Sequence, residues 1–376
     1  MQPGRKIRVL IVDDSAIVRK TLSEIVSAEP DLEVAGTAPD PFIARDKILS
    51  LRPDVLTLDL EMPRMDGLTF LKKLMRFHPL PVVVVSSLGQ ASSKAALEAL
   101  ESGAVEVVAK PGGPYSVGEL GIQLANKIRA AALARLGGRA PLPEPPQARV
   151  EAFRGDAGSA HVIGIGASTG GVEALGHLLG AMPEQLPAIV VVQHIPAVFS
   201  ATLAQRLNQT CRIRVREARD GDALEPGLAL IAPGNFHLTV RAAGGGYRAV
   251  IGGGPAVHYQ RPAVDVLFES LAQAAGSDAV GVILTGMGAD GAAGLLAMKR
   301  AGARTIAQDE ATCVVFGMPR EAIRLGAVDE VLPLQRMAPA VVRLAAETST
   351  RNAQARERSS DKRGMPMPAW PAGEKT

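Results

Sequence analysis

Acidic residues directly follow apolar runs in the first third of the chain. Asp13 and Asp14 come after the run IRVLIV, and Asp59 ends the run VLTLD. Ser86 and Lys110 stand at the ends of two further apolar runs. Clustered carboxylates repel one another unless a cation is present, and oxygen-only ligands favour a hard ion such as Mg²⁺. A metal, a carboxylate nucleophile, a hydroxyl and an ammonium are the groups needed to form and hold an acyl phosphate.

A serine, a histidine and an aspartate stand in comparable places in the second half. Ser168 lies in the Gly-rich stretch GIGASTGG, His194 follows the run IVVVQ, and Asp290 lies in the Gly-rich stretch TGMGADG. An alcohol, an imidazole and a carboxylate that orients the imidazole are the groups of acyl-transfer chemistry. Their chain order differs from the orders of α/β-hydrolases, chymotrypsin and subtilisin, so the order implies no common triad fold.

These residues also have interpretations that involve no chemistry. The first aspartates and Ser168 could cap helices, His194 could be a strand-end residue, and Asp290 could be a turn acid. The stretch GIGASTGG also lies near a dinucleotide fingerprint, but its third glycine position holds Thr169. Gln193 and His194 stand where that fingerprint has a ribose-binding acid. The joint placement at strand ends favours the catalytic interpretation.

The elements that must position these residues alternate between strand and helix. Val/Ile/Leu runs separated by amphipathic segments predict a parallel sheet covered on both faces, of flavodoxin type with strand order 2-1-3-4-5. In that order the carboxyl ends of strands one and three are neighbours, so the acids converge. The expected strands are Ile7–Val12, Leu32–Thr37, Val55–Asp59, Val82–Ser86 and Val105–Ala109, with helices near 15–27, 41–50, 67–76 and 91–101 and from Val117.

The composition then changes and a second α/β pattern follows. Residues 137–159 are rich in Gly, Pro and Ala without a period, which is typical of a linker. Further strands are expected at Val162–Ile165, Ile189–Val192, Leu228–Ile231 and Val280–Leu284, with a hairpin over Leu238–Gly252. The pattern predicts a doubly wound α/β domain with a mainly parallel sheet. We expect domains at 5–125 and 160–347, a helix end and flexible linker at 126–159, and a disordered tail at 348–376.

Composition excludes several classes of protein. The chain has 376 residues, 47% hydrophobic and 21% charged, so most of it should fold. The net charge of +3 comes from the linker and the tail, which argues against nucleic-acid binding. No apolar run approaches the roughly 20 residues of a membrane helix, and the start of the chain lacks a secretory pattern. Two cysteines supply no disulfide framework, so we expect a cytoplasmic protein.

Residues 5–125 resemble the receiver domain of bacterial response regulators. The resemblance lies in VLIVDDS, LDLEMPRMDG, VVVVSS and AKP. It implies that Asp59 accepts a phosphoryl group whose oxygens Ser86 and Lys110 bind. The ligands that it implies for Mg²⁺ are Asp13, Asp14, Asp59 and the backbone carbonyl of Glu61. Val107 stands where the family usually has an aromatic switch residue.

Residues 160–347 resemble the catalytic domain of the chemotaxis-specific protein-glutamate methylesterase. The resemblance lies in GIGASTGG, VVQHIP, RPAVDVLF, ILTGMGADG and AQDEATCVVFGMPREA, and the order of receiver, linker and esterase matches as well. It implies that Ser168 is the nucleophile, His194 the general base and acid, and Asp290 the orienting carboxylate. The backbone amide of Met287 is the oxyanion donor by the same analogy.

Together the resemblances imply a response regulator of a chemotaxis two-component phosphorelay with a phosphorylation-activated hydrolase. Its expected reactions are hydrolysis of glutamate methyl esters and deamidation of glutamines on methyl-accepting chemotaxis receptors. A sensor histidine kinase would be the phosphodonor, Mg²⁺ would bind the receiver, and hydrolysis would need no cofactor. We expect a monomer that binds no nucleic acid and does not insert into membranes. A response regulator with a non-catalytic, partner-binding output domain and a nicotinamide-dependent oxidoreductase are the alternatives.

Overall fold

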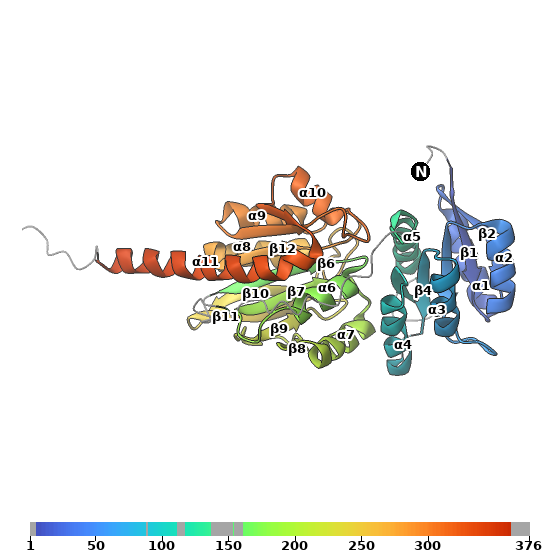
Figure 1. Cartoon of the computed structure of the whole chain (residues 1–376), viewed down its shortest axis with the longest axis horizontal. Helices are drawn as coiled ribbons and strands as arrows, with labels where there is room; N and C mark the ends of the chain where they lie inside the picture. Colours follow the sequence, from blue (N-terminus) through green and yellow to red (C-terminus); the bar gives the residue numbers. More distant parts are fainter. Residues whose placement is uncertain (1–4, 88, 111–116, 137–152, 154–160, 362–376) are drawn as a thin grey trace, which may run out of the picture.

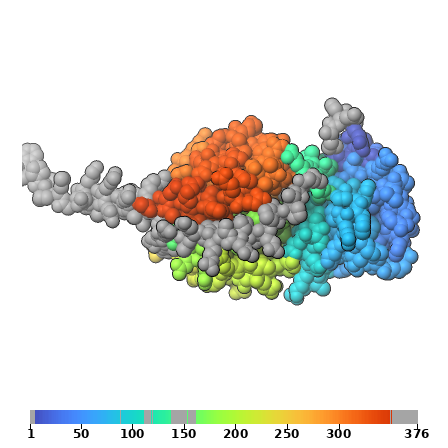
Figure 2. Space-filling model, in the orientation of Figure 1, coloured from blue at the N-terminus to red at the C-terminus, as the bar shows by residue number. Residues whose placement is uncertain are grey.

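The chain forms two α/β halves that lie side by side (Figures 1 and 2). The structure is a computed structural model that describes residues 5–87, 89–110, 117–136, 153 and 161–361. Each half has its own parallel sheet. Helices α4 and α5 of the first half lie on the side that faces the second half, while α2 lies on the far side (Figure 1).

The first half has the flavodoxin-type architecture that the sequence predicts. Its described strands have the order β2-β1-β3-β4-β5, and all pairs are parallel. The elements are β1 (Ile7–Val12), α1 (Ala16–Ala28), β2 (Leu32–Ala38), α2 (Pro41–Leu51), β3 (Val55–Asp59), α3 (Gly67–Phe77), β4 (Val82–Ser86), α4 (Gln90–Glu101), β5 (Glu106–Ala109) and α5 (Val117–Leu133).

Alternate side chains of the strands pack against helices on opposite faces of this sheet. Leu10 and Leu58 belong to one buried cluster with residues of α2, α3 and α4. Val9 and Val83 belong to another buried cluster, with residues of α1 and α5. Burial on both faces explains why the strands are continuous apolar runs without alternation. The sheet therefore fixes the ends of β1, β3, β4 and β5, where the acidic and phosphoryl-binding candidates lie.

The second half is doubly wound around a longer parallel sheet. Its described strands have the order β14-β13-β12-β6-β7-β9-β8, with a separate antiparallel hairpin β10-β11. The elements are β6 (Val162–Ala167), α6 (Gly171–Gly180), β7 (Ala188–Gln193), α7 (Ala197–Thr210), β8 (Arg214–Glu217), β9 (Leu228–Ile231), β10 (His237–Ala243), β11 (Gly246–Gly252), α8 (Val264–Ala274), η1 (Gly276–Asp278), β12 (Ala279–Ile283), α9 (Ala292–Arg300), β13 (Arg304–Gln308), α10 (Met318–Arg324), β14 (Glu330–Leu332) and α11 (Leu334–Asp361).

The strand order of the second sheet reverses at β6. Strands β7, β9 and β8 lie on one side of β6, and β12, β13 and β14 lie on the other. In open α/β sheets, the crevice at such a reversal, outside the carboxyl ends of the strands, is where ligands bind. Residues that follow β6, β7 and β12 therefore meet at one place, and these are the segments that carry the predicted serine, histidine and aspartate.

The structure corrects the expected disordered tail at 348–376 only as far as residue 361, because residues 362–376 lie outside the described part of the chain. Helix α11 begins at Leu334 and continues to Asp361, and it projects from the second half (Figure 1). Its first part packs on α6, β12 and β13. The continuation is polar and has no apolar stripe, but Ala, Gln, Arg and Glu are strong helix formers, so an anchored helix continues through it. No helix in the described part of the chain is long and apolar enough to span a membrane.

Candidate active site

Ser168 lies in the tight turn between β6 and α6. The helix cap is Gly170, with φ of 76°, and the cap makes no side-chain hydrogen bond, so Ser168 does not serve as the N-cap. A Cβ at Gly170 would lie 2.1 Å from Val314, and one at Gly171 would lie 2.1 Å from the Gln193 side chain. These two glycines let the chain turn tightly and let neighbouring groups approach the serine.

His194 and Asp290 form a buried pair beside this turn. His194 Nε2 lies 2.7 Å from Asp290 Oδ2, and the two side chains are 3% and 2% exposed. An ionised carboxylate only accepts hydrogen bonds, so the neutral ring carries its proton on Nε2 and a lone pair on Nδ1. Nδ1 is buried and has no hydrogen-bond partner in the described part of the chain. The ring therefore has one nitrogen held by an acid and one available as a base.

Several donors keep Asp290 ionised. Burial by itself raises the pKa of this carboxyl, but the hydrogen bond and charge of His194 lower it. The backbone amides of Val264 and Asp265 also donate to the Asp290 oxygens, at 2.8 and 2.9 Å, and lower the pKa further. The net result is a pKa below the ordinary value. A charged carboxylate at this position orients the histidine ring and stabilises an imidazolium.

Gln193 connects the turn of the serine to the strand end of the histidine. Its Nε2 donates to the carbonyl oxygens of Ser168, at 2.9 Å, and of His194, at 3.2 Å. The His194 amide also donates to the carbonyl of Ala167 at 3.1 Å. Gln193 is only 3% exposed. This buried amide therefore fixes the separation between the two residues. Sequence patterns alone do not indicate this role, because it depends on which strands are adjacent.

Three of the predicted residues line one surface cavity. Ser168, His194 and Met287 line the same cavity. The Met287 amide has no hydrogen-bond partner among the residues that the structure describes, as expected of a donor kept for an oxyanion. The structure thus brings together the serine, the histidine, the aspartate and the candidate oxyanion donor.

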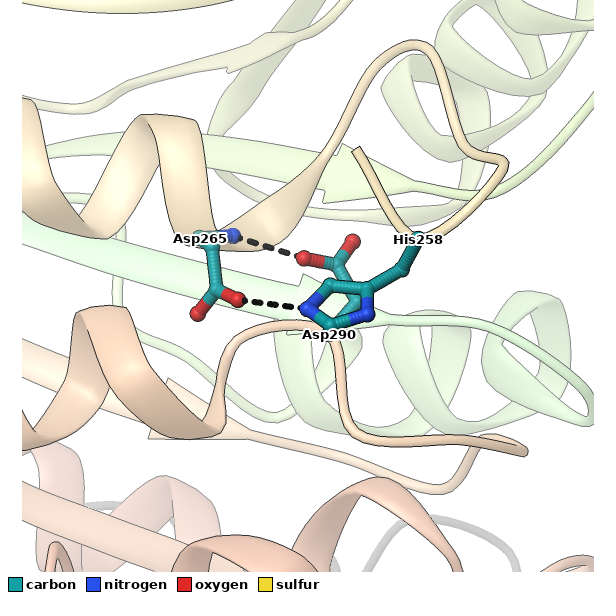
Figure 3. A group of neighbouring side chains, drawn as sticks. All are labelled: His258, Asp265 and Asp290. Carbon is teal, nitrogen blue, oxygen red and sulfur yellow. Dashed lines mark hydrogen bonds and ion pairs between the residues drawn. The ribbon is translucent and has the colours of Figure 1, made fainter. Parts of the chain in front are cut away.

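A second acid, Asp265, lies next to Asp290, and no motif in the sequence indicated a role for it. Asp265, at the start of α8, accepts from the Gly294 amide at 2.7 Å, and His258 Nε2 lies 3.2 Å from Asp265 Oδ2 (Figure 3). Burial and the charge of Asp290 raise the pKa of Asp265. The three side chains have the spacing of a metal site, but each carboxylate oxygen already accepts a hydrogen bond from the protein. Structural support for Asp290 explains this cluster without a metal.

The acidic candidates of the first half converge as well. Asp13, Asp14 and Asp59 each place a carboxylate oxygen within 4.8 Å of the others. Lys110 Nζ lies 2.8 Å from Asp59 Oδ2 and 3.3 Å from Asp13 Oδ2. Ser15, not an aspartate, caps α1 by accepting from the Val18 amide. Helix capping therefore does not account for Asp13 and Asp14.

The electrostatics of this cluster suit a cation. Burial raises the pKa of Asp13 and of Asp59, although the Lys110 ammonium opposes the shift. Apart from that ammonium, the buried Oδ2 atoms of Asp13 and Asp59 have no hydrogen-bond partner among the described residues. Oxygen-only donors with unsatisfied buried charge fit a hard divalent ion such as Mg²⁺. Ser86, 1% exposed, stands at the end of the neighbouring strand β4.

Both halves match known protein families. Residues 9–118 match the response regulator receiver domain and residues 163–341 match the CheB methylesterase. The protein-glutamate methylesterase/protein-glutamine glutaminase 2 of Syntrophus aciditrophicus is 57% identical over 340 residues, which are 90% of this chain and 99% of that protein. The chain belongs to this methylesterase/glutaminase family.

Another curated relative and a solved structure are also similar to this chain. The protein-glutamate methylesterase/protein-glutamine glutaminase of Salmonella typhimurium is 52% identical over 334 residues, which are 88% of this chain and 95% of that protein. The crystal structure of the Thermotoga maritima CheB methylesterase catalytic domain is 40% identical to this chain and covers 49% of it and 98% of that chain, with a TM-score of 0.48. Membership of an enzyme family does not favour the alternative of a non-catalytic output domain.

The receiver domain contacts the methylesterase domain beside the candidate nucleophile. Glu106, the first residue of β5, is 5% exposed and accepts from the Thr169 hydroxyl at 2.5 Å. Lys127 of α5 lies 2.5 Å from the other Glu106 oxygen. Arg206 of α7 forms an exposed ion pair with Glu101 of α4. A buried, charge-assisted contact thus holds the receiver at the residue that follows Ser168.

The interface also has an apolar part and a cavity. Val314 and Val315 of the methylesterase domain belong to the same buried cluster as Ile128 of α5. Glu106 and Val107 line a cavity together with Ser168 and His194. The receiver therefore forms one wall of the space above the candidate nucleophile, and Val107, at the position of the usual aromatic switch residue, faces that space.

Proposed function

We propose that this protein is a serine hydrolase that removes methyl groups from glutamate methyl esters of methyl-accepting chemotaxis receptors. The observation that carries the proposal is the buried His194 ring, held by Asp290 at Nε2 and unpartnered at Nδ1, beside the cavity that Ser168 lines. Family membership adds the substrate class, since the relatives are named for glutamate methyl esters and glutamine. The same site would release ammonia from a receptor glutamine instead of methanol from an ester.

The proposed reaction has two steps. The Ser168 oxygen forms a bond to the ester carbonyl carbon while its proton passes to His194 Nδ1, and the Met287 amide donates to the resulting oxyanion. Collapse of this intermediate breaks the bond to the methoxy oxygen, which takes the proton from His194 and leaves as methanol. A water molecule then attacks the acyl-enzyme with the same proton relay, and free glutamate and Ser168 result. Asp290 keeps the imidazolium in place through both steps.

We further propose that Asp59 accepts a phosphoryl group from a sensor histidine kinase. Asp13, Asp14, Asp59 and the Glu61 carbonyl would hold Mg²⁺, which supplies neutralisation of phosphoryl charge when bound. Ser86 and Lys110 would bind the phosphoryl oxygens, and the Lys110 ammonium already lies 2.8 Å from Asp59. We infer that the protein works as a monomer in the cytoplasm, consistent with cysteines that are free in the described structure.

Phosphorylation would act through the contact between the domains. The docked receiver forms one wall of the cavity at Ser168 and His194, so it competes with a large substrate for that space. A phosphoryl group on Asp59 would shift the equilibrium towards the undocked form, in which the site is open. The expected consequence is faster receptor demethylation with a phosphodonor than without one.

The experiment is methanol release from membranes that carry methylated receptors. The full-length protein should release methanol, and acetyl phosphate with Mg²⁺ should raise the rate. Asp59→Asn is the matched control, because it should keep the basal rate and lose the response to acetyl phosphate. Absence of methanol release in both conditions would contradict the proposed hydrolase, while release without any response would contradict only its regulation.

A further inference from the structure

A strained turn stands at the rim of the candidate active site. Val257 and Gln260 exchange backbone hydrogen bonds, at 3.1 and 2.8 Å, around His258 and Tyr259. These two central residues have φ of 51° and 61°, which is the geometry of a tight turn usually built with Asn and Gly. Left-handed backbone is unfavourable for large side chains and persists mainly where the side chain has a function. Two bulky residues in succession at such positions therefore need an explanation.

His258 ties this turn to the catalytic acid. Its Nε2 lies 3.2 Å from Asp265 Oδ2, and the Asp265 amide donates to Asp290 Oδ1 at 2.9 Å (Figure 3). Asp265 is buried, so the imidazole is anchored at its polar end. Beyond the turn, the Arg261 guanidinium donates to the Asn235 side chain and to the Gly254 carbonyl. The turn is thus held at a fixed position relative to the histidine–aspartate pair.

The position of Tyr259 shows no structural role for its side chain. Its side chain is 68% exposed, and its hydroxyl has no hydrogen-bond partner in the described part of the chain. It lines the same cavity as Ser168, His194 and Met287. Ile122 of α5, itself 44% exposed, lines that cavity from the receiver side. An aromatic ring at the mouth of a catalytic cavity, facing a surface that a regulatory domain occupies, is placed to contact whatever enters when that domain leaves.

We propose that Tyr259 is a specificity-determining residue that packs on the polypeptide surface around the scissile glutamyl group. The inference rests on the proposed function and names how that site selects a protein substrate. An exposed aromatic residue on an anchored turn offers a large contact area at a small entropic cost. Its contribution is to the affinity for the folded receptor, so a small ester that reaches only Ser168 gains nothing from it. His258 acts as a positioning residue for the turn.

The test compares Tyr259→Asn and Tyr259→Phe in the full-length protein, with acetyl phosphate and Mg²⁺ present. Asn tolerates left-handed φ, so Tyr259→Asn should leave the thermal midpoint unchanged or raise it. It should raise KM for methylated receptor membranes by about tenfold with kcat nearly unchanged. Hydrolysis of p-nitrophenyl acetate should not change, and Tyr259→Phe should retain parental KM. Phe77→Asn, at a 75% exposed aromatic position on α3 of the receiver, is the matched control and should leave the hydrolysis of both substrates unchanged.

Three results would overturn the inference. Parental KM for Tyr259→Asn on receptor membranes would show that the ring contacts no substrate. Equal losses on the receptor and on the small ester would assign the ring a structural role. A lower thermal midpoint for Tyr259→Asn would show that the fold needs the tyrosine. Failure of the proposed function is distinguishable, because the parent itself would then release no methanol.

Discussion

Replacing Glu106 with alanine should raise receptor demethylation in the absence of any phosphodonor. Glu106 belongs to the receiver, yet its carboxylate accepts the buried hydrogen bond from Thr169, the residue after the candidate nucleophile. Alanine removes this bond and leaves Lys127, which is 16% exposed, without its counter-ion at the interface. Both changes weaken the docked arrangement and leave the candidate catalytic residues untouched.

The size of the effect follows from burial. A hydrogen bond to a charged group contributes about 1.5–3 kcal/mol, and about 1.4 kcal/mol corresponds to a factor of ten in an equilibrium. The docked state should therefore lose roughly 10–150-fold in population relative to the undocked state. Glu101→Ala removes the interdomain ion pair with Arg206, whose side chains are 38% and 41% exposed. Exposed pairs contribute about 0.2–1 kcal/mol, so this matched variant should change the rate by at most about fivefold.

The assay is the initial rate of methanol release from methylated receptor membranes, with and without acetyl phosphate. Glu106→Ala should have a high basal rate and a small further response, and Glu106→Gln, which keeps an acceptor for Thr169, should lie between it and the parent. Circular dichroism and phosphorylation of Asp59 check that the receiver still folds. A parental basal rate for Glu106→Ala, or equal gains in the two alanine variants, would contradict the proposed role of Glu106 in docking.

Three other substitutions test single residues of the two sites. Asp290→Asn should lower kcat for demethylation by about 10⁴-fold at neutral pH, because an amide can donate to the ring and favour the wrong tautomer; a near-parental kcat would contradict the assignment. Gln193→Met should lower kcat by about 10²-fold with KM unchanged, because the link between Ser168 and His194 is lost; a change in KM alone would contradict this role. Asp13→Asn should stabilise the receiver by about 1 kcal/mol at neutral pH while weakening Mg²⁺ binding, as thermal melts and titration would show. Burial raises the pKa of Asp13, so the folded parent loses stability as pH rises through that pKa, and the stabilisation by Asp13→Asn should shrink in acid. A stabilisation that is independent of pH would contradict burial of the Asp13 charge as its cause.

Apolar patterning was sufficient to predict the sheet of the first half. The strands Ile7–Val12, Val55–Asp59 and Val82–Ser86 have the bounds that the runs of apolar residues indicate. Because both faces of the sheet are buried, such strands are continuous apolar runs, and a single residue of another type does not hide this pattern. The order β2-β1-β3-β4-β5 then brings Asp13 and Asp59 together without further assumptions.

Features that depend on distant contacts were not predictable in the same way. The continuation of α11 to Asp361 depends on an anchored first part, because its polar residues supply no pattern. Gln193 and Asp265 support the candidate catalytic residues through backbone carbonyls and amides that belong to other strands and loops. The buried contact of Glu106 with Thr169 joins residues 63 positions apart in two domains. Such partners can be identified only when the positions of the strands, helices and loops relative to one another are known.

Methanol release by Ser168→Ala is the measurement that decides whether an alcohol, an imidazole and a carboxylate at the carboxyl ends of β6, β7 and β12 act as one hydrolytic unit. We expect the variant to fold and to accept phosphate at Asp59. It should release methanol from methylated receptors at least about 10³-fold more slowly than the parent. Release at the parental rate would contradict the proposed role of Ser168, because the serine oxygen would then form no bond to the substrate.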